Sequence, residues 1–99
     1  MDKYYIWYIA GGVTVSNCSI IMTIIQANRV ETAVKVQDVL TKYGCHIRVR
    51  LGLHDAAVGG CTNSGIILLQ LCGEDVPVQQ IEQELNVIPD VKVKYMSLE

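Results

Sequence analysis

The chain has 99 residues, eight of them basic and ten acidic, for a net charge of −2. This length accommodates one domain, and the mild negative charge, spread along the chain, excludes a general electrostatic attraction for nucleic acid. Hydrophobic residues make up 51% of the chain and charged residues only 18%. Since little polar material is left to coat a monomer, we expect a homodimer or homotetramer.

The first part of the chain has no charged residue between Tyr4 and Asn28. Polar residues and the pair Gly11-Gly12 interrupt this run, and its apolar members are largely β-branched or aromatic, as in strands rather than membrane spans. The start Met-Asp-Lys is also a poor basic leader for a signal peptide. We therefore expect no membrane contact, and interpret residues 1–21 as an extension that either forms a hairpin or precedes the true start at Met22.

The next two segments have a strand pattern and then a helix pattern. Residues 21–27 form a short apolar run typical of a core strand. Residues 29–43 follow at helical spacing, and Gly44 supplies a stop. The apolar stripe expected for this helix is Val30, Ala33, Val34 or Val36, Leu40 and Tyr43.

Residues 45–54 alternate strictly and predict a second strand. Residues 55–64 have the composition of a loop, and the run 66–72 is apolar on both faces, which predicts a central strand covered on both sides. One helix layer covers one face, so we expect the other sheet face to pack against a second subunit. On the strand 45–54, one side carries Cys45, Ile47, Val49, Leu51 and Leu53, and the other carries His46, Arg48, Arg50, Gly52 and His54.

A second helix and a last strand complete the chain. Asp75 and Pro77 open the helix, Pro89-Asp90 closes it, and residues 91–99 alternate as an edge strand would. The order β-α-β-β-α-β over residues 21–99 predicts the α+β, ferredoxin-like arrangement, a four-stranded antiparallel sheet with two helices on one face. The apolar stripe of the second helix is Val78, Ile81, Leu85 and Ile88.

Several segments within this order resemble a known family. NRVETAVKVQDVLTKYG, a strand ending in RLGLH, then GIILLQLCG and IPDVKVKYM are similar to small bacterial proteins described as regulators of the iron-only hydrogenase system. That family resembles ACT-like domains and the C-terminal, metal-sensing domain of the nickel-responsive repressor. The resemblance implies an ACT-like domain over residues 22–99 and a regulatory role.

The same resemblance implies a metal site at His46, His54 and Cys61. The nickel-sensing relatives bind metal through histidines from two strands and one cysteine, partly from another subunit, and this chain has those residue types in the same order. Imidazole nitrogen with thiolate sulfur suits a transition metal such as nickel, zinc or iron. His46 lies about 26 Å from His54 along an extended strand, so it could complete the site only across a symmetric interface.

Two further features could bind a small ligand or anion. Gly59 and Gly60 can bring backbone N–H groups close to an anion, and Asn63 adds a donor. Arg48 and Arg50 could meet a carboxylate or phosphate. Turn chemistry explains the glycine segment equally well, and a solvated strand face explains the arginines.

The four cysteines include no Cys-x-x-Cys pair, so we expect a reduced, cytoplasmic protein. No nucleophile, base and orienting residue stand together, so we expect no enzyme. The resulting hypothesis is a regulatory or sensor domain that oligomerises through its sheet and binds a metal or small ligand at the loop between the second and third core strands. Without a DNA-binding motif, a transcriptional effect needs a partner protein. The alternative is a structural assembly or protein-interaction module with no ligand.

Overall fold

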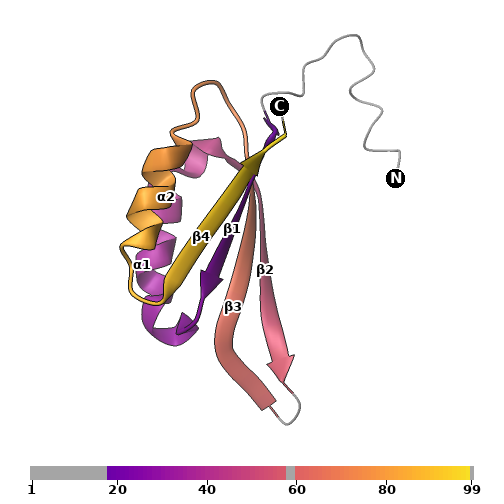
Figure 1. Cartoon of the computed structure of the whole chain (residues 1–99), viewed down its shortest axis with the longest axis vertical. Helices are drawn as coiled ribbons and strands as arrows, with labels where there is room; N and C mark the ends of the chain where they lie inside the picture. Colours follow the sequence, from indigo (N-terminus) through magenta and orange to yellow (C-terminus); the bar gives the residue numbers. More distant parts are fainter. Residues whose placement is uncertain (1–17, 58–59, 99) are drawn as a thin grey trace, which may run out of the picture.

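The computed structural model of the chain describes residues 18–57 and 60–98, with 54–57 and 60–63 described by their backbone alone. Figure 1 shows the elements as one sheet with both helices on the same face. The elements are β1 (Ile20–Gln26), α1 (Arg29–Lys42), a 3₁₀ turn (Gly44–His46), β2 (Ile47–Ala57), β3 (Gly60–Leu71), α2 (Val78–Asn86) and β4 (Val91–Ser97).

The four strands form one antiparallel sheet in the order β2-β3-β1-β4. With α1 and α2 together on one face (Figure 1), this is the ferredoxin-like βαββαβ fold predicted from the sequence. β1 and β3 are the central strands, as expected from the run 66–72, and β2 and β4 are the edges.

The core lies between the sheet and the helices. Met22 of β1 and Leu69 of β3 are cross-strand partners on the helix-covered face, and each is at most 1% exposed. Burying a side chain of this size stabilises the fold by about 1.5–3 kcal/mol. The buried cluster is completed by Ile24, Val36, Leu40, Tyr43, Ile67, Leu71, Ile81, Leu85, Ile88, Val91 and Val93.

The buried stripe of α1 differs in part from the one predicted. Of the two alternatives, Val36 faces the core and Val34 does not, and Leu40 and Tyr43 are buried as expected. Val30 and Ala33 are exposed, and Thr32 is buried instead. The Thr32 hydroxyl donates to the carbonyl oxygen of Asn28 at 2.9 Å, so its burial leaves no unsatisfied group. Closely spaced valines allow more than one stripe, so the pattern left Val34 and Val36 as alternatives and wrongly included Val30.

The alternation predicted for residues 45–54 is broken near its start. The 3₁₀ turn takes up Cys45 and His46, and β2 begins at Ile47. A bulge between Ile47 and Val49 shifts the register, so Ile47 packs against the core whereas Val49 lies on the opposite face of the sheet. From Val49 to Leu53 the alternation holds.

The predicted loop 55–64 is mostly strand. β2 continues to Ala57 and β3 begins at Gly60, and these two residues pair directly. Pairing in a hairpin satisfies backbone N–H and C=O groups whatever the side chains are. Small and polar residues, which in isolation indicate a loop, are therefore accommodated in an extended hairpin.

The last two elements agree with their sequence patterns. Ile81 and Leu85 of α2 are buried, and β4 alternates between buried and exposed residues. Asp90 joins them with a left-handed backbone (φ 66°). The side-chain oxygen of Asn86 accepts a hydrogen bond from the backbone N–H of Val93 at 3.1 Å and so ties the end of α2 to β4.

The predicted N-terminal hairpin falls mainly on residues 1–17, which lie outside the described residues. β1 begins at Ile20, two residues before the predicted domain boundary at Met22. Within residues 18–57 and 60–98, no helix has the length and apolar character needed to cross a membrane.

Candidate functional site

The predicted metal ligands lie at both ends of the β2–β3 hairpin. His46 is in the 3₁₀ turn before β2, whereas His54 pairs with Gly65 and Cys61 pairs with Ala56 near the hairpin tip. The side chains of His54 and Cys61 lie outside those described, so the metal site stays a prediction. Among the side chains that the structure describes, no cluster of three His, Cys, Asp or Glu residues forms.

Of the predicted anion-binding residues, the structure describes Gly60 and the backbone of Asn63. Gly60 is the first residue of β3, and Asn63 lies within that strand with its side chain outside those described. Gly59 lies outside the described residues. The start of β3 lies away from the helices (Figure 1).

The two predicted ligand-binding arginines occupy different environments. Arg48 lies in the bulge and is exposed. Arg50 pairs with Leu69 and so belongs to the helix-covered face of the sheet. The prediction that both arginines alternate on one face is wrong because the bulge adds a residue between Ile47 and Val49.

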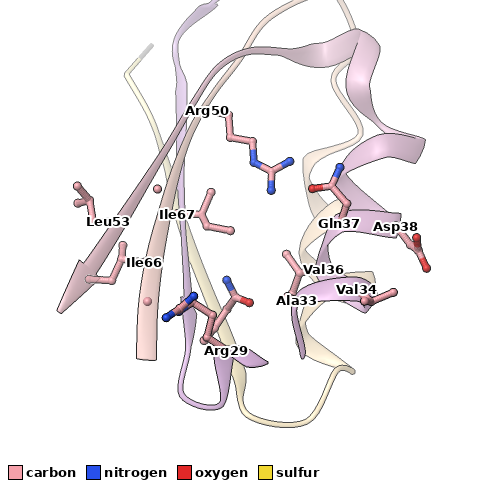
Figure 2. Close-up of a pocket in the computed structure, with 13 residues that line it drawn as sticks. Arg29, Ala33, Val34, Val36, Gln37, Asp38, Arg50, Leu53, Ile66 and Ile67 are labelled. Atoms are coloured by element: carbon pink, nitrogen blue, oxygen red, sulfur yellow. The ribbon is translucent and has the colours of Figure 1, made fainter. Parts of the chain in front are cut away.

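A groove of about 480 Å³ lies on that face, between α1 and the β2–β3 pair. Figure 2 shows its lining residues, with Arg50 extending from β2 towards α1, where Gln37 lies. Ala33 and Val36 of α1 and Ile67 of β3 provide apolar lining. Sequence reasoning found Arg50 but missed the groove, because it depends on the spacing between a helix and an edge strand.

Arg29, the first residue of α1, lies across β3 at one end of the groove. A Cβ atom added at Gly65 would lie 2.9 Å from Cδ of Arg29, closer than van der Waals contact allows. Glycine at position 65 therefore makes room for the arginine stem. Among the described residues, Nε of Arg29 is buried and has no hydrogen-bond partner, an arrangement that costs free energy unless a partner arrives.

The floor of the groove is open at Gly52. A Cβ atom added there would meet no atom within 4 Å. Asp38 is the acidic lining residue, and Figure 2 shows its carboxylate pointing away from Arg29 and Arg50. Within the part of the chain that the structure describes, the Lys42–Glu84 ion pair involves neither groove arginine. The groove therefore carries the positive charges of Arg29 and Arg50 beside its apolar lining.

The opposite sheet face, here called the outer face, carries a patch of aliphatic side chains. The register places Leu53, Ile66 and Ile25 in one cross-strand row and puts Leu51 beside Leu68 in the next. Neither helix covers this face (Figure 1). Its aliphatic members are Ile25, Val49, Leu51 and Leu53, which are 42–50% exposed, and Ile66 and Leu68, which are half-buried.

A disulfide joins Cys18 to Cys72, with Cα atoms 4.0 Å apart. The expectation that the cysteines are reduced is wrong for this pair, whereas Cys45 is free and exposed. Gln70 supports the junction, because its side-chain amide donates to the carbonyl oxygen of Cys18 at 3.0 Å. The two cysteines are 54 residues apart, and only the pairing of β1 with β3 brings them together, which spacing along the chain does not reveal.

No protein-family model and no curated protein matches the chain. Among solved structures, the chain is similar to the uncharacterized protein TM1266 from Thermotoga maritima, with a TM-score of 0.67 and 26% identity over 81% of this chain and 95% of that chain. This similarity supports the fold and brings no activity with it.

More distant similarity links the chain to two dimeric ferredoxin-like proteins. One, of unknown function, is from Thermobifida fusca (TM-score 0.42, 12% identity, 81% of this chain and 92% of that chain). The other is from an uncultured marine organism (TM-score 0.41, 8% identity, 79% and 89%). At these TM-scores the two structures carry no argument about the assembly of this chain.

Proposed function

We propose that this chain is a non-enzymatic regulatory domain that self-associates through the outer face of its sheet. Binding of a ligand would favour one subunit arrangement over another and so pass a signal to a partner protein. The observation that carries the proposal is the aliphatic outer face, which neither helix covers.

The composition of this face supports a contact between subunits rather than a solvated surface. Monomers rarely expose contiguous apolar patches larger than a few hundred Å². Here the patch extends over β2, β3 and β1, and the exposed Lys92 and Lys94 of β4 border it. Removing apolar surface from water contributes about 25 cal/mol per Å², so pairing two such faces is favourable.

A regulatory role is supported by the resemblance of residues 22–99 to the regulators of the iron-only hydrogenase system. The pathway and the partner protein belong to this proposal, as do the cytoplasmic location and the transition-metal site at His46, His54 and Cys61. The same chain order of histidines and cysteine in the nickel-sensing relatives supports the metal.

The self-association is tested with Leu51→Lys in the outer face. A charge placed in an apolar contact must be desolvated, so the variant should shift the protein from oligomer to monomer in sedimentation velocity. Val87→Lys is the matched control, because Val87 is 77% exposed at the end of α2. A monomeric wild-type protein, or an oligomer unchanged by Leu51→Lys, would contradict the proposal.

The ligand is tested by native mass spectrometry on protein purified without an affinity tag or chelator. One metal per subunit, lost in both His54→Ala and Cys61→Ala, would support the metal-sensing form of the proposal. A metal-free oligomer unchanged by either substitution would overturn that form. A partner interaction insensitive to both chelators and metabolites would favour the structural assembly module instead.

A further inference from the structure

We propose that the groove between α1 and the β2–β3 pair binds a small molecule that has one carboxylate and an apolar body. The inference identifies a class of ligand for the proposed regulatory role. It concerns binding alone, so it can hold or fail independently of the contact through the outer face.

The position of Arg29 is the first argument. Its Nε is buried without a partner among the described residues, and a missing partner for such a donor costs free energy. The glycine at position 65 leaves room for the arginine in this position, because a Cβ there would approach Cδ to 2.9 Å and the side chain would have to shift. The chain thus holds the positively charged Arg29 side chain at one end of the groove.

Arg50 of β2 also supports the proposal, because it brings a second positive charge to the groove. The side chain extends from β2 towards α1 (Figure 2). The planar guanidinium group has a fork of donors that matches the two oxygens of a carboxylate. Asp38 points away from the two arginines in Figure 2, so it does not occupy the place of the ligand.

The apolar lining decides what else the ligand contains. Ala33, Val36 and Ile67 line the groove beside the arginines, and the space above Gly52 is open. The volume of about 480 Å³ is within the range of small-molecule sites, which combine apolar walls with a few orienting polar groups. Val36 and Ile67 are already buried, whereas Ala33 and Leu53 of the lining are exposed. A hydrocarbon body attached to the carboxylate would remove this exposed apolar lining from water, which a bare inorganic anion does not do.

The test is an NMR titration of the full chain, labelled with ¹⁵N, with sodium hexanoate as the probe. We expect saturable shifts of the Gly52 and Gly65 amide signals, with a dissociation constant of about 1–10 mM for so small a ligand. 1-Hexanol keeps the body without the charge, and inorganic phosphate keeps the charge without the body. Both should bind at least about tenfold more weakly than hexanoate, since 1-hexanol lacks the carboxylate and phosphate lacks the apolar body.

Three variants assign the site. Arg50→Met should weaken hexanoate binding about tenfold or more, the loss expected for a charge-assisted hydrogen bond. Gly52→Leu should abolish binding by filling the open floor, and its Cβ has room, so folding should survive. Arg48→Met is the matched control, because it removes the same charge from the same strand outside the groove.

Three results would overturn the inference. One is the absence of shifts at Gly52 and Gly65 in hexanoate, and another is phosphate binding as tight as that of hexanoate. The third is an equal loss of binding in Arg48→Met and Arg50→Met, which would reduce the effect to general charge attraction. A monomeric protein that still binds hexanoate would keep this inference while contradicting the self-association.

Discussion

The two faces of the sheet differ in what covers them. On the helix-covered face, Met22 and Leu69 are at most 1% exposed, whereas on the outer face Leu51 and Leu53 are 45–50% exposed. Both faces nevertheless carry aliphatic residues at most positions of the central strands. The comparison teaches that the apolar content of this chain exceeds what two helices can bury.

The difference also separates two kinds of stability. The helix-covered face is buried within one chain, so its contribution to folding is independent of protein concentration. No described residue covers the outer face, so burying it against a second subunit would contribute stability that depends on protein concentration. Neighbouring residues on β3 allow the two contributions to be measured separately.

The largest effect is expected for Leu69→Ala, with Leu68→Ala as its partner on the other face. Leu69 is fully buried under the helices, so its truncation should lower the free energy of unfolding by about 3–4 kcal/mol. Leu68→Ala should cost about 1 kcal/mol in the monomer. Urea denaturation at two protein concentrations measures both.

The concentration dependence distinguishes the two variants. The wild-type midpoint should rise with protein concentration, and Leu68→Ala should reduce that rise, whereas Leu69→Ala should leave it in place. Equal losses for both variants at a concentration where the protein is monomeric would mean that the outer face is already buried within the chain.

The second effect is that of the disulfide, which links the start of β1 to the end of β3 and depends on neither face. A closed loop spanning 54 residues corresponds to roughly 4 kcal/mol in the chain-entropy description, so Cys18→Ser with Cys72→Ser should cost about 2–4 kcal/mol. Urea denaturation with and without a reductant measures it. Oligomer size should stay the same.

Cys45→Ser is the control for this pair, because Cys45 is free and exposed. It should leave the unfolding midpoint unchanged in both conditions. A reductant that shifts the midpoint of neither the wild-type protein nor Cys45→Ser would show that the Cys18–Cys72 bond does not contribute to stability.

The fold was accessible from the sequence because its signals are local and repeated. The apolar runs of β1 and β3, the stripe of α2 and the alternation of β4 each predict one element, and their order leaves few topologies. The errors arise where a pattern permits two solutions. Closely spaced valines on α1 allowed two stripes, and a single bulge after Ile47 moved Arg48 out of alternation with Arg50.

The candidate site was less accessible, because it depends on distances between elements. Arg50 was a candidate ligand-binding residue together with Arg48, but nothing in the sequence places it beside α1. Gly52 and Gly65 are far apart in the chain and become the floor of one groove only through the β2–β3 register, which pairs Gly52 with Ile67 and His54 with Gly65. The Cys18–Cys72 bond likewise depends on strand pairing, in this case that of β1 with β3.

The smallest effect is expected in the helix layer, where polar side chains of α1 and α2 contact each other. Glu84 of α2 accepts hydrogen bonds from the hydroxyl of Tyr43 and, at 3.0 Å, from Nζ of Lys42, both near the end of α1. The Tyr43 hydrogen bond, with a second one from Lys42, holds the pKa of the Glu84 carboxyl below its ordinary value of 4.5.

A carboxyl group whose pKa is lowered by folding contributes stability above its unfolded pKa and loses it as pH falls through the folded pKa. The unfolding midpoint in urea should therefore decline between pH 5 and pH 3 more steeply in the wild-type protein than in Glu84→Gln. Glu82→Gln removes the same charge from the same helix but leaves Tyr43 and Lys42 bonded to Glu84, so it should retain the wild-type slope. Because this contact lies at the surface of the helix layer, the change should not alter oligomer size. Equal slopes for Glu84→Gln and the wild-type protein would mean that the two helices are held together by their apolar contacts alone.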